Sequence, residues 1–139
     1  MRLLLYPIAS VALVGLWGCG GQGFHQVKGK VVYMDGSDVS VLTGGFVLFD
    51  PADPEGPPKG SARGEIHQDG SFTMGRYKEG DGVIPGKYRV MVTQPPFLGG
   101  RGKVPPPLLD PRFKDFESSG LEITVSGPIA DYSVTVAKP

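Results

Sequence analysis

The side chains of this 139-residue chain that could carry acid–base or nucleophilic chemistry are few and lie far apart. Its two histidines are His25 and His67. The alternation around Ile66 places His67 on the opposite face of an expected strand, so the pattern favours a solvated histidine over a metal ligand. Ser61 and Ser71 do not lie in the Gly-x-Ser-x-Gly turn that exposes a nucleophilic serine in many hydrolases. The sequence therefore predicts no catalytic residue.

Two acidic clusters offer the hard oxygen atoms that calcium prefers, Asp50 with Asp53 and Glu55, and Glu79 with Asp81. Their spacing does not match the twelve-residue calcium loop, which has oxygen ligands at alternate positions. We expect solvated turns here, with no bound metal and no cofactor.

The N-terminus has the pattern of an export signal. Met1-Arg2 supplies a positive start, and an apolar stretch from Leu3 to Leu16 follows. This stretch is shorter than the roughly 20 residues that cross a membrane as a helix, and Pro7 further disfavours a spanning helix, so a signal peptide is predicted. The only cysteine of the chain, Cys19, lies directly beyond it. A lone cysteine excludes an intrachain disulfide.

The sequence Leu16-Trp17-Gly18-Cys19 resembles the lipobox of bacterial lipoproteins, although Trp17 stands where that family has a small residue. The resemblance implies that the Cys19 thiol receives a diacylglyceryl group, that the signal is cut before Cys19, and that the new amino group is acylated. Several acyl chains make a stable membrane anchor. The alternative is an ordinary signal peptide with an incidental cysteine. We expect residues 1–18 to be the signal, 19–24 a flexible tether and 25–139 one domain.

Composition favours an all-β domain. The chain has 22 glycines and 14 prolines, which fall between short apolar runs and so punctuate many strands. Its 14 basic and 14 acidic residues balance, and no basic run is present. A nucleic-acid partner is therefore not expected.

Seven runs have the alternation of strands, namely residues 25–33, 45–50, 62–66, 72–74, 87–93, 121–126 and 132–137. Two lysines in the first run predict an edge strand, whereas the continuous apolar run from Phe46 to Phe49 predicts a central strand covered on both faces. The dipeptide Asp69-Gly70 predicts a two-residue hairpin turn with positive φ at Gly70. Gly127-Pro128 predicts a terminal hairpin between the last two runs.

These elements predict a seven-stranded antiparallel β-sandwich. The chain resembles the carboxypeptidase regulatory-like, transthyretin-like domains of bacterial surface lipoproteins, which implies a prealbumin-like Greek-key sandwich that serves as an accessory or adhesion module. The resemblance rests on the order and spacing of four segments, namely Val27-Lys28-Gly29-Lys30-Val31, Gly45-Phe46-Val47-Leu48-Phe49, Asp69-Gly70-Ser71-Phe72 and Pro85-Gly86-Lys87-Tyr88-Arg89-Val90. One enzyme of this fold group, 5-hydroxyisourate hydrolase, has a C-terminal Tyr-Arg-Gly-Ser sequence. This chain ends in Val-Ala-Lys-Pro, and its Tyr88-Arg89 pair continues into a strand.

The segment from Gln94 to Gly120 has no strand alternation and forms a long predicted loop, chiefly residues 95–120. Loops of this length are commonly functional or disordered. We predict that a partner contacts it through five side chains, Phe97, Arg101, Leu108, Leu109 and Phe113. The competing interpretation is that its apolar residues plug the open end of the sandwich. A plug would bury them and protect the segment from trypsin at Arg101 and Lys103.

Together these features predict a non-catalytic, lipid-anchored module of the cell envelope, facing the periplasm or the cell exterior. Its expected partners are the membrane, through Cys19, and an envelope protein or glycan. The alternative is a small envelope hydrolase with an unrecognised site in a transthyretin-like fold.

Overall fold

The computed structural model describes residues 23–56, 58, 60–96, 100, 102–103 and 106–139. The predicted signal peptide, Cys19 and most of the predicted tether lie outside these residues. Seven β-strands form two sheets, and the described part of the chain contains no α-helix. None of its helical turns is long and apolar enough to cross a membrane.

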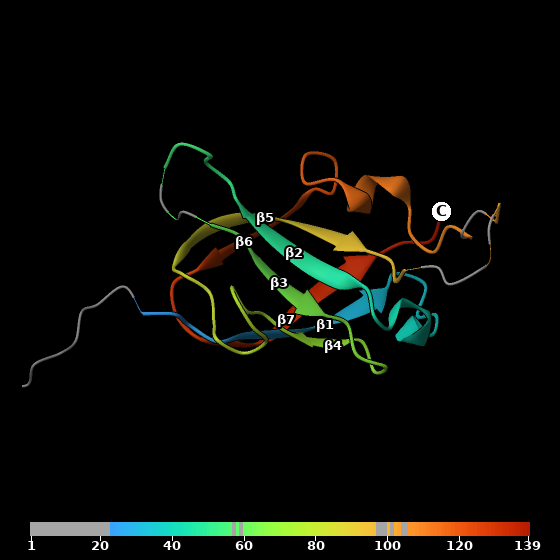
Figure 1. Cartoon of the computed structure of the whole chain (residues 1–139), viewed down its shortest axis with the longest axis horizontal. Coiled ribbons are helices and arrows are strands. Elements are labelled where there is room, and N and C mark those ends of the chain that lie inside the picture. Colours follow the sequence, from blue (N-terminus) through green and yellow to red (C-terminus); the bar gives the residue numbers. More distant parts are fainter. Residues whose placement is uncertain (1–22, 57, 59, 97–99, 101, 104–105) are drawn as a thin grey trace, which may run out of the picture.

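The strands are β1 (Val27–Tyr33), β2 (Phe46–Pro51), β3 (Ala62–Glu65), β4 (Ser71–Thr73), β5 (Gly86–Thr93), β6 (Leu121–Val125) and β7 (Ile129–Val136). Two short 3₁₀-helices, η1 (Val39–Leu42) and η2 (Pro111–Lys114), lie in the connections. The number of strands and their approximate positions confirm the all-β prediction (Figure 1).

The four-stranded sheet has the order β3-β2-β5-β6, with every neighbouring pair antiparallel. Its central strand β2 confirms the position predicted for the apolar run. The prediction that this strand is covered on both faces was wrong in part. Val47 and Phe49 are buried, whereas Phe46 and Leu48 are only half-buried. In β5 the alternation is as predicted, with Tyr88 and Val90 among the buried side chains.

The three-stranded sheet has the order β4-β1-β7. Strand β1 is therefore central, and its prediction as an edge strand was wrong. Lys28 and Lys30 are exposed on the outer face of the sheet and do not occupy its hydrogen-bonding edges. Strand β7 runs parallel to β1, with Val31 opposite Val134, which corrects the expectation of a wholly antiparallel sandwich.

Two segments that were predicted to be hairpins are in fact connections from one sheet to the other. Strand β6 pairs with β5, whereas β7 pairs with β1, so the last two strands do not form a hairpin. Strands β3 and β4 also belong to different sheets, joined by one isolated bridge between Arg63 and Gly75. These two crossings close the sandwich at both sides.

The turn before β4 differs from the predicted two-residue form. Gly70 has φ of 85°, which confirms the predicted positive φ. Asp69 has negative φ, since no non-glycine residue described has a positive one. The Gly70 amide donates to the carbonyl of His67, and the His67 amide donates to that of Ser71. This pattern is a three-residue loop in which the left-handed glycine follows the turn.

The core lies between the sheets and is centred on aromatic rings. The ring of Phe49 lies 5.7 Å from that of Tyr88 and 6.1 Å from that of Tyr132, and Phe72 contacts Tyr132 edge-on at 6.5 Å. Full burial of one such side chain stabilises the fold by about 1.5–3 kcal/mol. Both sheets contribute rings, so the two layers depend on each other.

Candidate functional site

The residues predicted to meet a partner are divided by the structure. Phe97 and Arg101 lie outside the described residues. Leu109 is fully buried, Phe113 is 3% exposed and both belong to the core. Neither side chain can contact a partner in this arrangement. The plug interpretation requires both of them to be buried in this way. Leu108 is half-buried and packs against the core, with part of its side chain still accessible.

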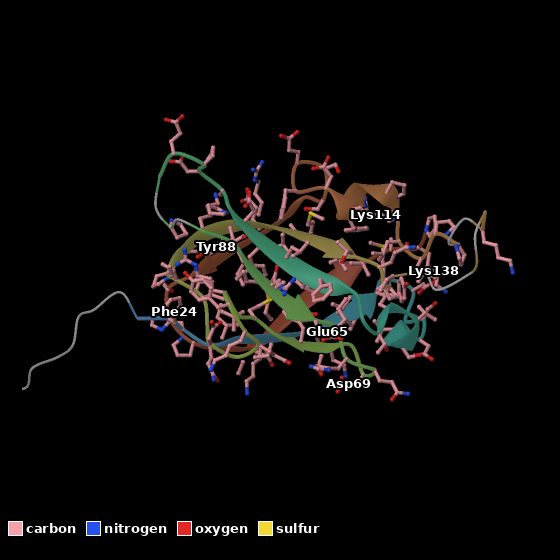
Figure 2. The ribbon with its side chains drawn as sticks, viewed as in Figure 1. Phe24, Glu65, Asp69, Tyr88, Lys114 and Lys138 are labelled. Carbon is pink, nitrogen blue, oxygen red and sulfur yellow. The ribbon has the colours of Figure 1, made fainter. Side chains whose placement is uncertain are left out.

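Leu108 lines a cleft with a volume of about 400 Å³ at one end of the sandwich. We call this the Tyr33 cleft, and its lining residues are Tyr33, Ser37, Asp38, Val41, Pro107, Leu108, Lys138 and Pro139. They come from the end of β1, from η1, from the long loop and from the C-terminus. The cleft lies at the end of the molecule that carries Lys138, and Phe24 lies at the opposite end (Figure 2).

One wall of the cleft is fixed by hydrogen bonds to the long loop. The Tyr33 hydroxyl donates to the Leu108 carbonyl at 2.8 Å. The Leu108 amide donates to Oε1 of Gln94 at 3.1 Å, and Nε2 of Gln94 donates to the Pro106 carbonyl at 3.4 Å. Burial, and secondly the nearby carboxylate of Asp35, raises the pKa of Tyr33. The phenol therefore stays protonated and remains a donor at neutral pH.

The helical turn η1 forms the second wall. Asp38 caps it by accepting a hydrogen bond from the Ser40 amide at 2.9 Å. The turn then places Leu42 in the core and leaves Val41 48% exposed at the mouth of the cleft. Leu42 thus packs η1 against the core, and Val41 of the same turn remains exposed to solvent.

Lys138 supplies the charge at the rim. Its ammonium donates to the Ser37 hydroxyl at 2.7 Å, lies 3.8 Å from the carboxylate of Asp35 and lies 5.5 Å from the centre of the Tyr33 ring. A shallower depression beyond it is lined by Met34, Asp35, Ala137 and Lys138, and Met34 is 66% exposed. Apolar surface therefore continues past the ammonium group.

The chemistry of this cleft suits binding. Its accessible apolar groups belong to Val41, Leu108 and two prolines, and its charged groups already have partners within the chain. A site of this size with mostly apolar walls and a few fixed polar groups is typical of a ligand pocket. The one nucleophile–base contact of the cleft joins the Ser37 hydroxyl to the Lys138 ammonium at 2.7 Å, and in it the lysine donates the hydrogen bond and does not accept the serine proton.

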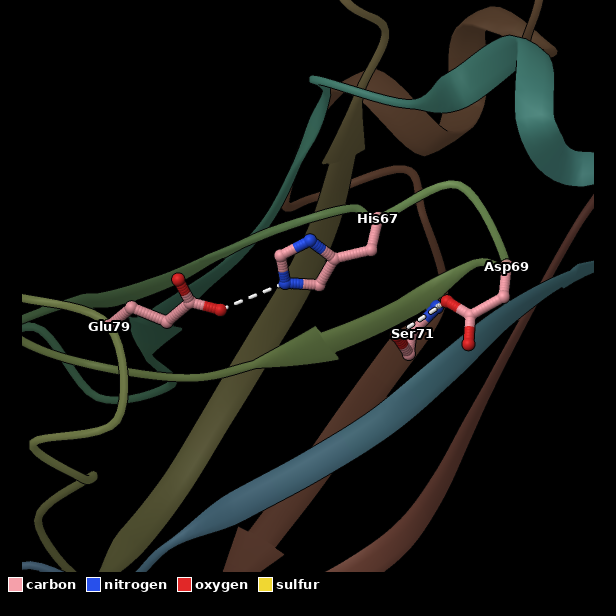
Figure 3. Close-up of polar contacts among 4 residues, drawn as sticks. All are labelled: His67, Asp69, Ser71 and Glu79. Carbon is pink, nitrogen blue, oxygen red and sulfur yellow. Dashed lines mark hydrogen bonds and ion pairs between the residues drawn. The ribbon is translucent and has the colours of Figure 1, made fainter.

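His67 lies in a separate polar region on the outer side of β3. Its Nε2 atom lies 2.9 Å from Oε1 of Glu79, and both side chains are about half exposed. The predicted exposure of His67 is confirmed. Figure 3 shows the ring directed to Glu79 and away from Ser71, whose hydroxyl donates to Asp69. This arrangement lacks the serine–histidine contact of a hydrolytic triad.

The acidic clusters act as acceptors in turns. The Asp81 carboxylate accepts hydrogen bonds from the amides of Arg76 at 2.6 Å and Tyr77 at 3.0 Å, and Asp53 accepts from the Glu55 amide at 3.0 Å. Within the described ranges, no three His, Cys, Asp or Glu side chains are grouped closely enough to hold a metal ion.

Comparisons of the chain with protein-family models, with curated proteins and with solved structures gave no match. The assignment of a site therefore depends on geometry alone. Sequence reasoning identified Leu108 but missed Tyr33, Val41 and Lys138, because the cleft joins four segments that are distant in sequence. The one local signal for the cleft is Val41, an apolar residue of η1 that remains exposed.

Proposed function

We propose that this protein is a non-catalytic, lipid-anchored module of the cell envelope that binds an envelope protein through the Tyr33 cleft. The resemblance of Leu16-Trp17-Gly18-Cys19 to a lipobox supports the anchor, and the apolar cleft supports binding. A protein partner is favoured over a glycan because the one aromatic ring of the cleft, Tyr33, is 4% exposed and has Lys138 over it. Sugar recognition usually needs an open aromatic face.

The observation that carries this proposal is the position of the cleft relative to Phe24, which follows Cys19 closely in the sequence. Phe24 lies five residues after Cys19, and five residues span at most about 18 Å when fully extended. The end of the sandwich that carries Phe24 is thus held near the lipid. Lys138, which lines the Tyr33 cleft, lies at the other end of the sandwich (Figure 2). An acylated Cys19 would therefore leave the cleft on the side away from the membrane.

The finer fold assignment belongs to the same proposal. Seven strands in sheets of three and four agree with a transthyretin-like, Greek-key sandwich of the carboxypeptidase regulatory-like type. The order of the segments that carry this resemblance supports an accessory or adhesion role.

Cross-linking in intact cells tests the cleft. Val41→Asp places a charge on an exposed apolar residue and should leave the fold intact while it abolishes the cross-linked adduct that the wild-type protein forms. Tyr77→Asp is the matched control, because Tyr77 is 79% exposed and lies outside the cleft. If the Val41→Asp variant forms the wild-type adduct, the cleft is not the binding site.

Cell fractionation tests the anchor separately. Wild-type protein should resist extraction by salt and be released by detergent, whereas Cys19→Ser should be released or remain uncleaved. A fully cleaved Cys19→Ser variant that stays bound as firmly as the wild type would contradict acylation.

A further inference from the structure

Four large apolar side chains are exposed in the described part of the chain, and the Tyr33 cleft accounts for two of them. Val41 lines the cleft, and Met34 lines the depression beside it. The other two are Phe24, which is 48% exposed, and Tyr77, which is 79% exposed. Single exposed apolar residues are ordinary, so these two rings need an explanation only if they share a surface.

Phe24 is held against the domain although its ring is exposed. The amide of His25 donates to the Val83 carbonyl, and the Val83 amide donates to the His25 carbonyl, both at 2.8 Å. Gly82 lies beside Phe24, because a Cβ built on Gly82 would be 2.8 Å from the Phe24 Cβ. The backbone therefore fixes the position of Phe24 next to residues 81–83.

A tight turn brings Tyr77 to the same region. The Asp81 carboxylate accepts hydrogen bonds from three successive amides, those of Arg76 at 2.6 Å, Tyr77 at 3.0 Å and Lys78 at 3.3 Å. The guanidinium of Arg76 lies 5.4 Å from the centre of the Tyr77 ring. Because Asp81 directly precedes the glycine beside Phe24, the two exposed rings share one surface.

The side chains of this surface suit the headgroup layer of a bilayer. We call it the aromatic surface, and it consists of Phe24, Arg76, Tyr77 and Lys78. Aromatic rings with a polar tip concentrate at membrane–water interfaces. Arginine and lysine lay their apolar stems along such a surface and keep their charges in the polar layer. The acidic groups of the same loop have partners within the chain, since Asp81 accepts from the turn and Glu79 lies 2.9 Å from His67.

We propose that the aromatic surface lies in the headgroup layer of the membrane that holds the chain. This inference rests on the proposed acylation of Cys19. The acyl chains attach the protein, and the aromatic surface fixes the orientation of the sandwich. Loss of the aromatic contact should therefore change orientation and leave attachment intact.

The occupant is the bilayer because the chain between the anchor and this surface is short. Five residues separate Cys19 from Phe24, and five residues span at most about 18 Å. A folded domain of 100 residues has a radius of gyration of about 13 Å and would not fit between this surface and the lipid. Phe24 also lies at the end of the sandwich opposite Lys138 (Figure 2).

Tryptophan fluorescence tests the contact in the full-length chain. Trp17 is the only native tryptophan, so Trp17→Phe makes an introduced indole the single reporter. Tyr77→Trp and Phe24→Trp, in vesicles of phosphatidylcholine and phosphatidylglycerol, should emit at shorter wavelength than in detergent-free buffer and should be quenched by brominated lipids. Val41→Trp is the matched control, because Val41 is also 48% exposed but lines the cleft, and its emission should not be quenched.

Flotation of the vesicles separates this contact from the anchor. A protein that floats with the vesicles while Tyr77→Trp is quenched no more than Val41→Trp would overturn the aromatic surface and leave the anchor standing. A protein that does not float would overturn both.

A second pair of variants tests whether the two rings act together. In the Tyr77→Trp protein, Phe24→Ser should reduce the quenching, since it removes the neighbouring apolar contact with the lipid. Met34→Ser changes an exposed apolar residue beside the cleft and should leave the quenching unchanged. Circular dichroism checks that both variants are folded. Equal quenching in the two folded variants would contradict a shared membrane contact.

Discussion

Gly70 combines a left-handed backbone with close packing. Its φ is 85°, and a Cβ built on it would lie 2.6 Å from the Val31 carbonyl oxygen. Gly36 has a similar φ of 76°, but a Cβ there would meet no atom within 4 Å. We expect Gly36→Ala to cost about 1 kcal/mol from backbone strain alone, and Gly70→Ala to cost clearly more. Urea midpoints measure both, and equal losses would show that the space at Gly70 is not limiting.

The hydroxyl of Tyr33 joins β1 to the long loop. Tyr33→Phe removes its hydrogen bond to the Leu108 carbonyl and should lower the free energy of unfolding by about 1 kcal/mol. Tyr77→Phe, at an exposed ring, should change it by less than about 0.5 kcal/mol.

The stability that the Tyr33 hydrogen bond contributes should fall at alkaline pH. Because the folded pKa of Tyr33 is raised above its ordinary value of 10.0, its contribution is fully present below pH 10.0 and is lost as pH rises through the folded pKa. The difference between wild type and Tyr33→Phe should therefore shrink at high pH. A difference that stays constant there would contradict the assigned hydrogen bond.

At the scale of elements, the loop around η2 is held to the sandwich by two apolar side chains. Leu109→Ala should destabilise the protein by about 2–5 kcal/mol, since it leaves a cavity in the core. It should also speed trypsin cleavage after Lys114. Val41→Ala is the control, because Val41 is exposed and its loss should change the unfolding midpoint little. Similar midpoints for the two variants would mean that the loop is not anchored through Leu109.

The strands were predictable and their partners were not. Alternation in β5 and β7 is a local property, so the buried residues Tyr88 and Val134 could be assigned from sequence. Sheet membership depends on contacts between distant segments. Gly127-Pro128 is compatible both with a hairpin and with a crossing between sheets, and only the packing of the whole core selects the crossing. The Tyr33 cleft was missed for the same reason.

At the scale of the molecule, three turns share the sequence Asp-x-Ser and should make stability sensitive to acid. Asp35, Asp38 and Asp69 each accept a hydrogen bond at 2.9–3.0 Å from the amide of the serine two residues later. Hydrogen bonds from these serines lower the pKa of all three carboxyl groups below 3.8. A lowered folded pKa gives stability that is present above pH 3.8 and is lost as pH falls through the folded values.

Melting temperature should therefore decline below about pH 4 as these groups take up protons. The triple variant Asp35→Asn, Asp38→Asn, Asp69→Asn should be less stable at neutral pH and show a flatter decline in acid. Thermal unfolding at a series of pH values measures this, and parallel curves for the two proteins would exclude these turns as the cause.

The pairing of β1 with β7 also sets the order in which the chain can fold. Val27 at the start of the domain is paired with Ile129 near its end, and β1 has β4 as its other neighbour. Strand β1 thus cannot complete its sheet until β7 has been made. Loop closure over such a distance is a slow step in folding. The three-stranded sheet can therefore form only once β7 has been made, so removal of residues 129–139 should prevent that sheet from forming.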